Sequence, residues 1–553
     1  MEERLPYTQE GTGSSPVPPT GVVVKLVYNA GLSRRRPRVR IPSTPPVSKG
    51  PLWRGITRDL FYPMECDDIF RGKGKMKILL IQPAQERGLG FRSLAVVEPL
   101  GLESIAGSLS AHKVRILDLR IENHLPQVLR DFQPDFCGIN CSFTIDVYQT
   151  REISSTIKAW NGQLPVFVGG HHASLSPEDF YCPSIDGVVI GEGEIAIRDL
   201  VTAWENGGDP KDIPGLVLNK ASGPYYTPDR PMAENLDEFP MPARQLTRQY
   251  RKHYHLGFQK PFSIMETARG CAYRCDFCSV WKFFNGKCRM KSPERVLQEI
   301  KNIPEKYIFL ADDNFLMSVP RAKRIAQMLM DNKIKKHFTF QGRSDAIVQH
   351  PEVVPLLRKA GFWKVFIGFE KIDEESLSHL NKHNSVHNNE EALKILRAHG
   401  MEVIAAFIID PAFQEQDFQR LRQYILDRKL YSPSLTILTP LPGTDLFNRV
   451  RERLVTTNYE LFDYVHAVLP TKLKLADFYR EFTDLYKTGY AWSQIGWEGA
   501  AAILRHTFSI SHLISMKQAA WASVDPTNYL AGHEREVISL KTNQGWAGFS
   551  GGQ

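Results

Sequence analysis

The stretch FSIMETARGCAYRCDFC, residues 262–278, places three cysteines within eight positions directly after a short apolar run. The run FSIMET has the length and apolar content of a buried strand, and Ala268-Arg269-Gly270 has the composition of a turn that ends one. Beyond it, strand-like and helix-like segments alternate, which is typical of repeated βα units. The expected strands are 262–267, 307–312, 338–343, 364–369, 402–409 and 433–439, and the expected helices are 293–302, 320–331, 351–359, 388–399 and 416–428.

Six βα units predict a partial barrel, because a closed barrel needs eight. The cysteine loop follows the first strand and therefore lies at the C-terminal mouth of the barrel, where active sites of such barrels are found. Later strand ends carry groups that suit an amino acid moiety, whose ammonium needs oxygen acceptors and whose carboxylate needs a cationic donor. For each of these groups, an ordinary ion pair across the barrel rim is the alternative. The candidate residues are Asp312, Arg343, Gly368, Phe369 and Glu370.

Cys271, Cys275 and Cys278 are close enough in sequence to bind one metal centre. A structural zinc ion would need a fourth ligand, which Cys288 could supply ten residues later. A four-iron cluster held by three cysteines instead leaves one iron open for a substrate or cofactor. The total of eight cysteines is too small for a disulfide framework in a chain of 553 residues and fits a reducing cytoplasm.

A second alternation of strands and helices precedes the cysteine loop and predicts a doubly wound parallel sheet. Ligands of such sheets bind beyond the carboxyl ends of the strands, where glycines let a bulky group approach the backbone closely. The expected strands are 77–84, 113–120, 135–142, 165–170 and 187–192, with helices at 100–111, 124–132, 146–160 and 194–205. The candidate ligand-binding residues at the strand ends are Ser142, Gly169, Gly170, His172, Gly191 and Glu192.

The spacing C-x3-C-x2-C, with an aromatic residue before the last cysteine, closely resembles the radical S-adenosylmethionine (SAM) family. A doubly wound domain directly before such a barrel is similar to the cobalamin-binding members of that family. The segments Pro99-Leu-Gly-Leu102, Gly169-Gly170-x-His172-Ala173-Ser174 and Gly191-Glu192-Gly193-Glu194 match the same pattern, and the resemblance covers about residues 76–470. It implies three cofactors: a [4Fe-4S] cluster, SAM and cobalamin.

The resemblance also implies roles for individual residues. It makes Cys271, Cys275 and Cys278 the cluster ligands, and it places Gly368-Phe369-Glu370 where the family binds the methionine amino group. Pro440-Leu-Pro-Gly443-Thr444 resembles the closing loop of the family. The chain has no Asp-x-His-x-x-Gly segment, as is usual in this subfamily, so His172 is a candidate to contact cobalt or a corrin amide. The alternative is a histidine whose hydrogen bonds are satisfied within its own loop.

Cys137 and Cys141 have a spacing that would suit two ligands of a second cluster. No matching third cysteine is present, because Cys182 lies 41 residues beyond Cys141. The sheet pattern around the pair favours two cysteines in a hydrophobic core.

The implied reaction is methylation of an unactivated carbon, with the methyl group passing from SAM through methylcobalamin to a small or lipid substrate. The segment Tyr464-Val-His-Ala-Val-Leu-Pro-Thr-Lys-Leu and the tail after it are most similar to hopanoid C-3 methylase-type proteins. Two alternatives remain open: a radical SAM cyclase or oxidoreductase of the porphyrin-cyclase type, and a corrinoid- or cluster-binding sensor without turnover. An electron donor such as flavodoxin or ferredoxin is the expected protein partner.

The tail aromatic residues could form an apolar passage for a lipid or contact a membrane surface, and the alternative is a helical cap packed on the barrel. These residues are Trp492, Trp497, Phe508, Leu513 and Trp521. No apolar run is long enough to span a bilayer, and no secretory signal is expected at the N-terminus. We therefore expect a cytoplasmic protein, with peripheral membrane contact as an open possibility.

The net charge of +8 comes mainly from residues 1–75, which hold 13 Lys/Arg against 7 Asp/Glu and 10 of the 36 prolines. Such a stretch is typical of a disordered extension, and no nucleic-acid partner is expected. Met76, where the first strand begins, is a candidate translation start. The expected organisation is an extension at 1–75, a doubly wound domain at 76–207, a connector at 208–260, the partial barrel at 261–444, a helical region at 445–530 and a tail at 531–553.

Overall fold

The structure, a computed structural model, describes residues 75–84, 89, 95–257, 259–430, 433–489 and 518–542. The predicted extension, apart from Lys75, lies outside these residues. So do four of the five tail residues singled out above, and only Trp521 is described. None of the described helices has the length and apolar character needed to cross a membrane.

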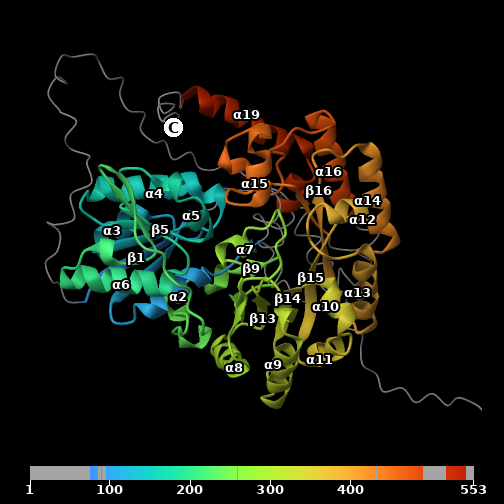
Figure 1. Ribbon diagram of the computed structural model, residues 1–553, viewed down its shortest axis with the longest axis horizontal. Helices are drawn as coiled ribbons and strands as arrows, with labels where there is room; N and C mark the ends of the chain where they lie inside the picture. The colour runs from blue at the N-terminus through green and yellow to red at the C-terminus, as the bar shows by residue number, and fades with distance from the viewer. Residues whose placement is uncertain are drawn as a thin grey trace, which may run out of the picture.

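The N-terminal half of the chain forms a sheet of seven strands in the order β3-β1-β4-β5-β6-β7-β8. The first five strands in this order are parallel, and apolar residues on both faces of β1 are buried under helices. Helices α3 and α4 cover one face, and α2 and α6 cover the other, so the sheet is doubly wound as predicted (Figure 1). The bounds are β1 Lys77–Gln82, α2 Leu100–Ser108, β3 Lys113–Asp118, α3 Leu125–Phe132, β4 Phe136–Asn140, α4 Val147–Trp160, β5 Val166–Gly169, α5 His171–Leu175, β6 Gly187–Val189 and α6 Gly193–Asn206.

A hairpin in the connector extends this first sheet. Strands β7 (Leu216–Lys220) and β8 (Gly223–Tyr226) pair antiparallel with each other, and β7 pairs antiparallel with β6. The sheet therefore continues past residue 207. The connector then runs to a two-residue strand, β9 (His255–Leu256), which pairs with β2 (Ala95–Val96).

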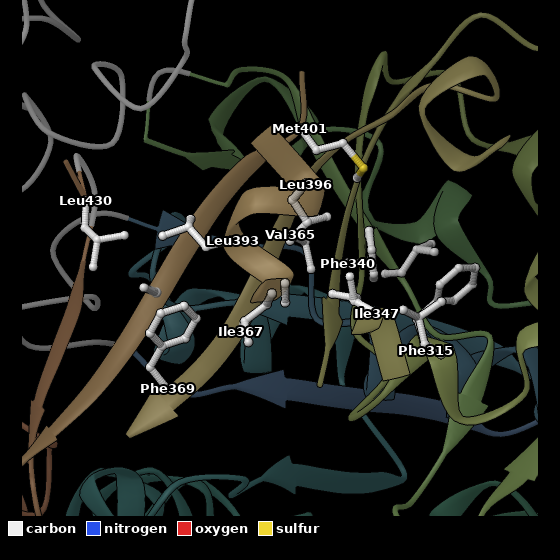
Figure 2. Packing of buried hydrophobic residues seen from close by; sticks show 14 of the residues in the cluster. Phe315, Phe340, Ile347, Val365, Ile367, Phe369, Leu393, Leu396, Met401 and Leu430 are labelled. Carbon is white, nitrogen blue, oxygen red and sulfur yellow. The ribbon is translucent and has the colours of Figure 1, made fainter. Parts of the chain in front are cut away.

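The second sheet has six parallel strands in the order of the chain, β10-β13-β14-β15-β16-β17, which confirms the partial barrel. Its outer face is covered by helices: Figure 2 shows Val365, Ile367 and Phe369 of β15 beside Leu393 and Leu396 of α13. The strands are β10 Phe262–Met265, β13 Tyr307–Leu310, β14 His337–Gly342, β15 Phe362–Glu370, β16 Glu402–Ile409 and β17 Ser434–Ile437. The helices are α8 Pro293–Asn302, α9 Val319–Asp331, α10 Ser344–Gln349, α11 Val353–Lys359, α12 Glu374–Ser378, α13 Val386–Ala398 and α14 Glu415–Asp427.

The C-terminal region packs on the last helix of the barrel. Helices α15 (Asp445–Val450), α16 (Leu475–Gly489) and α19 (Pro526–Thr542) are its described helices. Phe418 of α14 and Phe478 of α16 contact edge to face, with ring centroids 5.4 Å apart. Between α15 and α16 the chain is irregular, and Leu461, Phe462 and Val468 pack against Ile145 of the first domain. The C-terminal region therefore contacts both sheets.

The free cysteines of the first domain belong to its core. Cys137 and Cys141 are fully buried among apolar side chains, and Cys182 packs at the edge of the same cluster. Burial raises the pKa of both Cys137 and Cys141 far above its usual range, so both are neutral thiols. This agrees with a core role rather than with a second cluster.

A buried group of charges joins the first domain, the connector and the barrel. Arg244 of the connector lies 2.6 Å from Glu98 and 3.6 Å from Glu103 of the first domain, and 3.2 Å from Glu299 of α8. Arg251 also pairs with Glu98, at 3.2 Å. These charges are shielded from water, so removing one partner would leave the others uncompensated.

The group makes stability depend on pH through Glu103. Burial, together with the neighbouring Glu98 charge, raises the pKa of Glu103 to about 7. A carboxyl group whose pKa is raised in the folded state stabilises the fold fully at pH values below its pKa in the unfolded chain. This stability is lost as the pH rises through the pKa of the folded state.

Between pH 5 and pH 8, the wild type should lose up to about 3 kcal/mol of unfolding free energy relative to Glu103→Gln. Urea unfolding at several pH values measures this, with exposed Glu294→Gln as control. Parallel pH profiles for wild type and Glu103→Gln would contradict it.

Candidate active site between the two sheets

The cysteine loop projects from a short hairpin at the mouth of the barrel. Strand β11 (Ala268–Arg269) pairs antiparallel with β12 (Arg289–Met290), and the loop between them contains all three predicted metal ligands. Cys271, Cys275 and Cys278 are each partly exposed, and burial raises the pKa of each thiol, to about 12 for Cys278. A metal centre is therefore needed to hold them as thiolates.

The short helix α7 (Val280–Phe283) follows the last cysteine and fixes the loop. The indole Nε1 of Trp281 donates a hydrogen bond to the carbonyl of Cys275 at 3.0 Å. Among the described residues, no three His, Cys, Asp or Glu side chains are placed to hold a single metal ion. Three thiols on one loop are nevertheless the donor set that an iron–sulfur cluster requires, so the loop fits a cluster by its chemistry.

Asp312 supports the cysteine loop rather than facing the barrel mouth. Its buried carboxylate accepts hydrogen bonds from the backbone N–H and hydroxyl of Thr267 and from the N–H of Ala268. The next residue, Asp313, lies against the start of the cysteine loop. The N–H of Gly270 donates to Asp313 at 3.1 Å, and burial raises the pKa of Asp313 to about 6.

Arg343 also contacts the loop, and its charge is already paired. The guanidinium lies 3.6 Å from the ring centroid of Tyr273, a residue that stands between the first two cysteines in the sequence. It also lies 2.7 Å from the carboxylate of Asp345. It donates further hydrogen bonds to the carbonyls of Lys382 and His383. Arg343 is thus placed to hold the cysteine loop, and a ligand carboxylate would have to compete with Asp345.

The end of β15 forms an ammonium site. The Lys382 ammonium donates to the carbonyl of Gly368 and to the carboxylate of Glu370, both at 2.5 Å. A side chain on Gly368 would collide with both groups, because its Cβ would lie 2.0 Å from the Glu370 carboxylate and 2.4 Å from the Lys382 nitrogen. The Gly368 carbonyl and the Glu370 carboxylate, predicted to bind the methionine amino group of SAM, therefore do bind an ammonium group. In this structure it is the ammonium group of Lys382. Phe369 contributes no side chain, because its ring is buried against Phe407.

Three glycines lie at the carboxyl edge of the first sheet, Gly169, Gly170 and Gly191, and we call them the glycine cradle. Gly170 has φ +120° and Gly191 has φ +78°, and a Cβ on Gly191 would meet nothing within 4 Å. The Ser174 hydroxyl links the two turns, because it donates to the Gly170 carbonyl and accepts from the Gly191 N–H. Beside them the Ser142 hydroxyl donates to Asn140 at 2.8 Å, and Gly169 ends β5. The space beside Gly191 fits the close approach of a broad ligand such as a corrinoid, whereas Gly170 packs against the Cys141 carbonyl, from which a Cβ would lie 2.7 Å.

His172 and Glu192 both make contacts with other protein groups. Both ring nitrogens of His172 are hydrogen-bonded, Nδ1 to Thr144 at 3.1 Å and Nε2 to Asp179 at 3.0 Å, and the side chain is buried. This is the arrangement of a histidine satisfied within the protein. Glu192 pairs with Arg269 and Arg289 of the cysteine hairpin, each at 2.7 Å, so it ties the first domain to the loop.

Three further residues neighbour or contact the predicted site residues and are not predicted from the sequence. His171 stacks on Phe283 of α7 and hydrogen-bonds through Nε2 to the hydroxyl of Ser279, next to Cys278. Phe143, at the end of β4, has half of its side chain exposed. Lys382 follows α12 and meets β15 only through the tertiary fold. Of the three, only His171 has a signal in the sequence, because it forms a pair with His172 directly after Gly169-Gly170.

The loops of the two domains touch directly. Helix α5 contacts α7, and a Cβ on Gly443 of the Pro-Leu-Pro-Gly loop would lie 2.9 Å from the Cβ of Leu175. Figure 1 shows α5 and α7 at the junction of the two units. The glycine cradle and the cysteine loop therefore lie on the two sides of one junction.

Replacing Cys288 with alanine should leave the metal centre intact. Cys288 lies in the hairpin after the loop, next to β12, and burial raises the pKa of its thiol to about 11. If three cysteines suffice, iron content and cluster absorption of Cys288→Ala should equal those of the wild type. If the wild type contained zinc instead of iron, and Cys288→Ala lost that zinc, the result would support the four-ligand alternative.

Comparisons with known proteins agree with this arrangement. The Radical SAM superfamily model matches residues 265–425, and the B12 binding domain model matches residues 87–201. The chain is 32% identical to the hopanoid C-3 methylase of Methylococcus capsulatus over 74% of this chain and 79% of that protein. It is 25% identical to the anaerobic magnesium-protoporphyrin IX monomethyl ester cyclase of Rubrivivax gelatinosus, over 71% of this chain and 73% of that one.

A solved structure shows the same architecture. The cobalamin-dependent SAM radical enzyme OxsB, with aqua-cobalamin and SAM bound, superimposes with a TM-score of 0.59 and 18% identity, covering 87% of this chain and 82% of that one. The predicted family, fold class and set of cofactors are thus confirmed: a [4Fe-4S] cluster, SAM and cobalamin. The chain belongs to the cobalamin-dependent radical SAM methyltransferases.

Proposed function

We propose that the methyl acceptor is an unactivated carbon of a polycyclic lipid of the hopanoid type. The observation that carries this proposal is the 32% identity to a hopanoid C-3 methylase over 79% of its length. A hopanoid C-2 methylase of Rhodopseudomonas palustris, 26% identical, is a further relative. A mainly hydrocarbon substrate offers few polar groups, so it must be held by apolar surface and by shape.

We further propose the following roles for the residues of the site. When bound, the cofactors supply the hydrogen abstraction and the methyl group, and the protein positions them and excludes water. Cys271, Cys275 and Cys278 hold the cluster. The Gly368 carbonyl and the Glu370 carboxylate bind the amino group of SAM after Lys382 moves away. The glycine cradle at the edge of the first sheet supports the corrinoid.

A partner that supplies single electrons, such as flavodoxin or ferredoxin, completes the proposal, because a cluster held by these cysteines would need an external electron donor to cleave SAM. We also propose a cytoplasmic location, since the described cysteines are all free. Trp521 has 62% of its side chain exposed and is the described residue best placed for a peripheral contact with the membrane that holds a lipid substrate.

The test is a labelled transfer with the reconstituted full chain. The anaerobic enzyme, loaded with cluster and cobalamin, is incubated with methyl-labelled SAM, a reductant and a hopanoid, and Cys278→Ala serves as control. The proposal expects label in the lipid and a mass gain of one methylene. Formation of 5′-deoxyadenosine without labelled product would favour the cyclase-type alternative, which the porphyrin-cyclase relative represents. A protein that consumes no SAM would favour the sensor alternative.

A further inference from the structure

The two turns of the glycine cradle are each followed by a residue that binds one end of the cysteine loop. His171 comes directly after Gly170, and Glu192 comes directly after Gly191. Both glycines have positive φ, +120° and +78°, which residues with a Cβ rarely adopt. The side chains that follow these two turns reach across to the barrel unit.

His171 binds the end of the loop that follows the last cysteine. Its Nε2 lies 2.9 Å from the hydroxyl of Ser279, the residue directly after Cys278. Its ring also stacks on Phe283 of α7, with ring centroids 4.6 Å apart and planes 15° apart. A hydrogen bond and a stacked ring both have preferred directions, so together they fix the position and the orientation of this end of the loop.

Glu192 binds the start of the loop. Its carboxylate pairs with Arg269, two residues before Cys271, and with Arg289 in the opposite strand of the hairpin, each at 2.7 Å. Glu194 pairs with Arg269 as well, at 2.6 Å. All four charged side chains are about a tenth exposed or less. Separating them would leave uncompensated charges away from water, so the start of the loop is held firmly against the first domain.

These contacts are parts of one closed ring around the junction. On the loop side, the rings of Phe283 and Phe284 lie edge to face at 4.7 Å, and the guanidinium of Arg289 lies 5.8 Å from the centroid of the Phe284 ring. On the side of the first domain, the Ser174 hydroxyl joins the two cradle turns through hydrogen bonds of 2.8 Å and 2.9 Å. Since packed groups transmit displacement to their neighbours, neither side of this ring can move alone.

The register of the two sides bears on the reaction, because the acceptor carbon must lie within reach of both. When the cofactors are bound, the loop side supplies the hydrogen abstraction and the cradle side supplies the methyl group. A misplacement of about 1 Å costs roughly 10²-fold in the rate of such a step. Residues that fix the register therefore act on product formation without touching the substrate.

We propose that His171 and Glu192 are positioning residues that hold the corrinoid edge of the first sheet and the cysteine loop in one register, so that corrinoid binding and assembly of the metal centre strengthen each other. The coupling is reciprocal, because a coupling free energy between two sites changes both affinities by the same factor. The effect on product formation rests on the proposed function, whereas the effect on binding does not.

The first test measures binding and needs no substrate. Hydroxocobalamin is added to the anaerobic full chain with and without its iron–sulfur cluster, and equilibrium dialysis gives the two Kd values. Loading the cluster should lower the Kd of the wild type by about fivefold or more. In cluster-free His171→Ala the Kd should stay within about twofold of the wild type, because the side chain contacts the loop, but loading should then lower it by about twofold or less.

Further variants separate this coupling from direct contact between the cofactors and from general damage. Ser279→Ala removes the hydrogen bond from the loop side and leaves the stack, so it should lose only part of the effect of loading. Combined with His171→Ala it should add no further loss, because both act through one contact. His399→Ala, at an exposed histidine after α13, is the matched control and should keep the full effect. Iron content and urea unfolding check that each variant is folded and loaded.

The second test follows the product. In His171→Ala the ratio of methylated lipid to 5′-deoxyadenosine should fall by about tenfold or more, while formation of 5′-deoxyadenosine stays within about threefold of the wild type. His171→Gln keeps a hydrogen-bonding group at the end of the side chain and should give a higher ratio than His171→Ala.

The two tests fail separately. If the wild type methylates no hopanoid, the proposed substrate fails, and the dialysis result still decides whether the two sites are coupled. An equal effect of loading in wild type and His171→Ala would mean that the cofactors interact directly and would overturn the proposal. A wild-type Kd that does not change on loading would overturn it as well.

Discussion

Replacing Cys278 with alanine should abolish both the brown absorption of the cluster, near ~400 nm, and the cleavage of SAM. A cluster bound by three cysteines cannot lose one without losing its attachment or the open iron that binds SAM. The loss of activity should reach the uncatalysed background, roughly 10⁶-fold or more. Cys271→Ala and Cys275→Ala should behave in the same way, because the loop holds all three thiols at the barrel mouth.

Iron analysis, the visible spectrum and 5′-deoxyadenosine formation measure this result on anaerobically purified protein. Cys182→Ala serves as a control, because that residue lies at the edge of the first-domain core. A Cys278→Ala protein that kept both its absorption and its cleavage of SAM would show that the cluster is held elsewhere.

The second large effect is expected from Gly270→Ala, directly before the first cysteine. Gly270 has φ +87°, and a Cβ there would lie 2.1 Å from the carbonyl oxygen of Lys287 in the opposite arm of the hairpin. Backbone cannot move aside as a flexible side chain can, so the β11–β12 hairpin must open. We expect Gly270→Ala to lose most of its iron and to be destabilised by about 3 kcal/mol or more.

Gly286→Ala provides the matched comparison on the same hairpin. Gly286 also has a positive φ, +68°, but a Cβ there would meet only the Arg274 side chain, at 3.8 Å. Gly286→Ala should therefore be destabilised only by the conformational strain of alanine at positive φ, which is about 1–2 kcal/mol, and not by a collision. Iron content and urea unfolding of the two variants separate the effects. Equal losses in both would mean that strain, and not the contact with Lys287, limits the loop.

Side-chain alternation explains one difference between the predicted and observed site. Along β15, Phe366, Gly368 and Glu370 are partly exposed, while Val365, Ile367 and Phe369 are buried under the helices. Successive residues of a strand point to opposite sides, so Phe369 cannot share the mouth with its two neighbours. Asp312 and Asp313, which follow β13, also have different partners: the carboxylate of Asp312 accepts hydrogen bonds from Thr267 and Ala268, and that of Asp313 accepts one from the N–H of Gly270.

The partners of the charged residues could not be predicted in the same way. Glu192 was selected as a cofactor-binding residue because it follows a strand end, and the structure pairs it with two arginines of the cysteine hairpin. Arg343 is predicted as a cationic donor, with an ion pair at the barrel rim as the alternative, and it is paired with Asp345. The roles of these residues toward the cofactors stay predictions.

The sequence by itself determined the order of strands and helices, the two α/β units, the family and the loop that holds the metal ligands. Each of these depends on spacing between near neighbours: the periodicity of apolar residues, and three cysteines within eight positions. The tertiary structure alone decided that Lys382 occupies the ammonium site and that Glu192 binds the cysteine hairpin. These contacts join residues far apart in the chain, and a side chain chooses among several possible partners only when packing has brought one of them within reach.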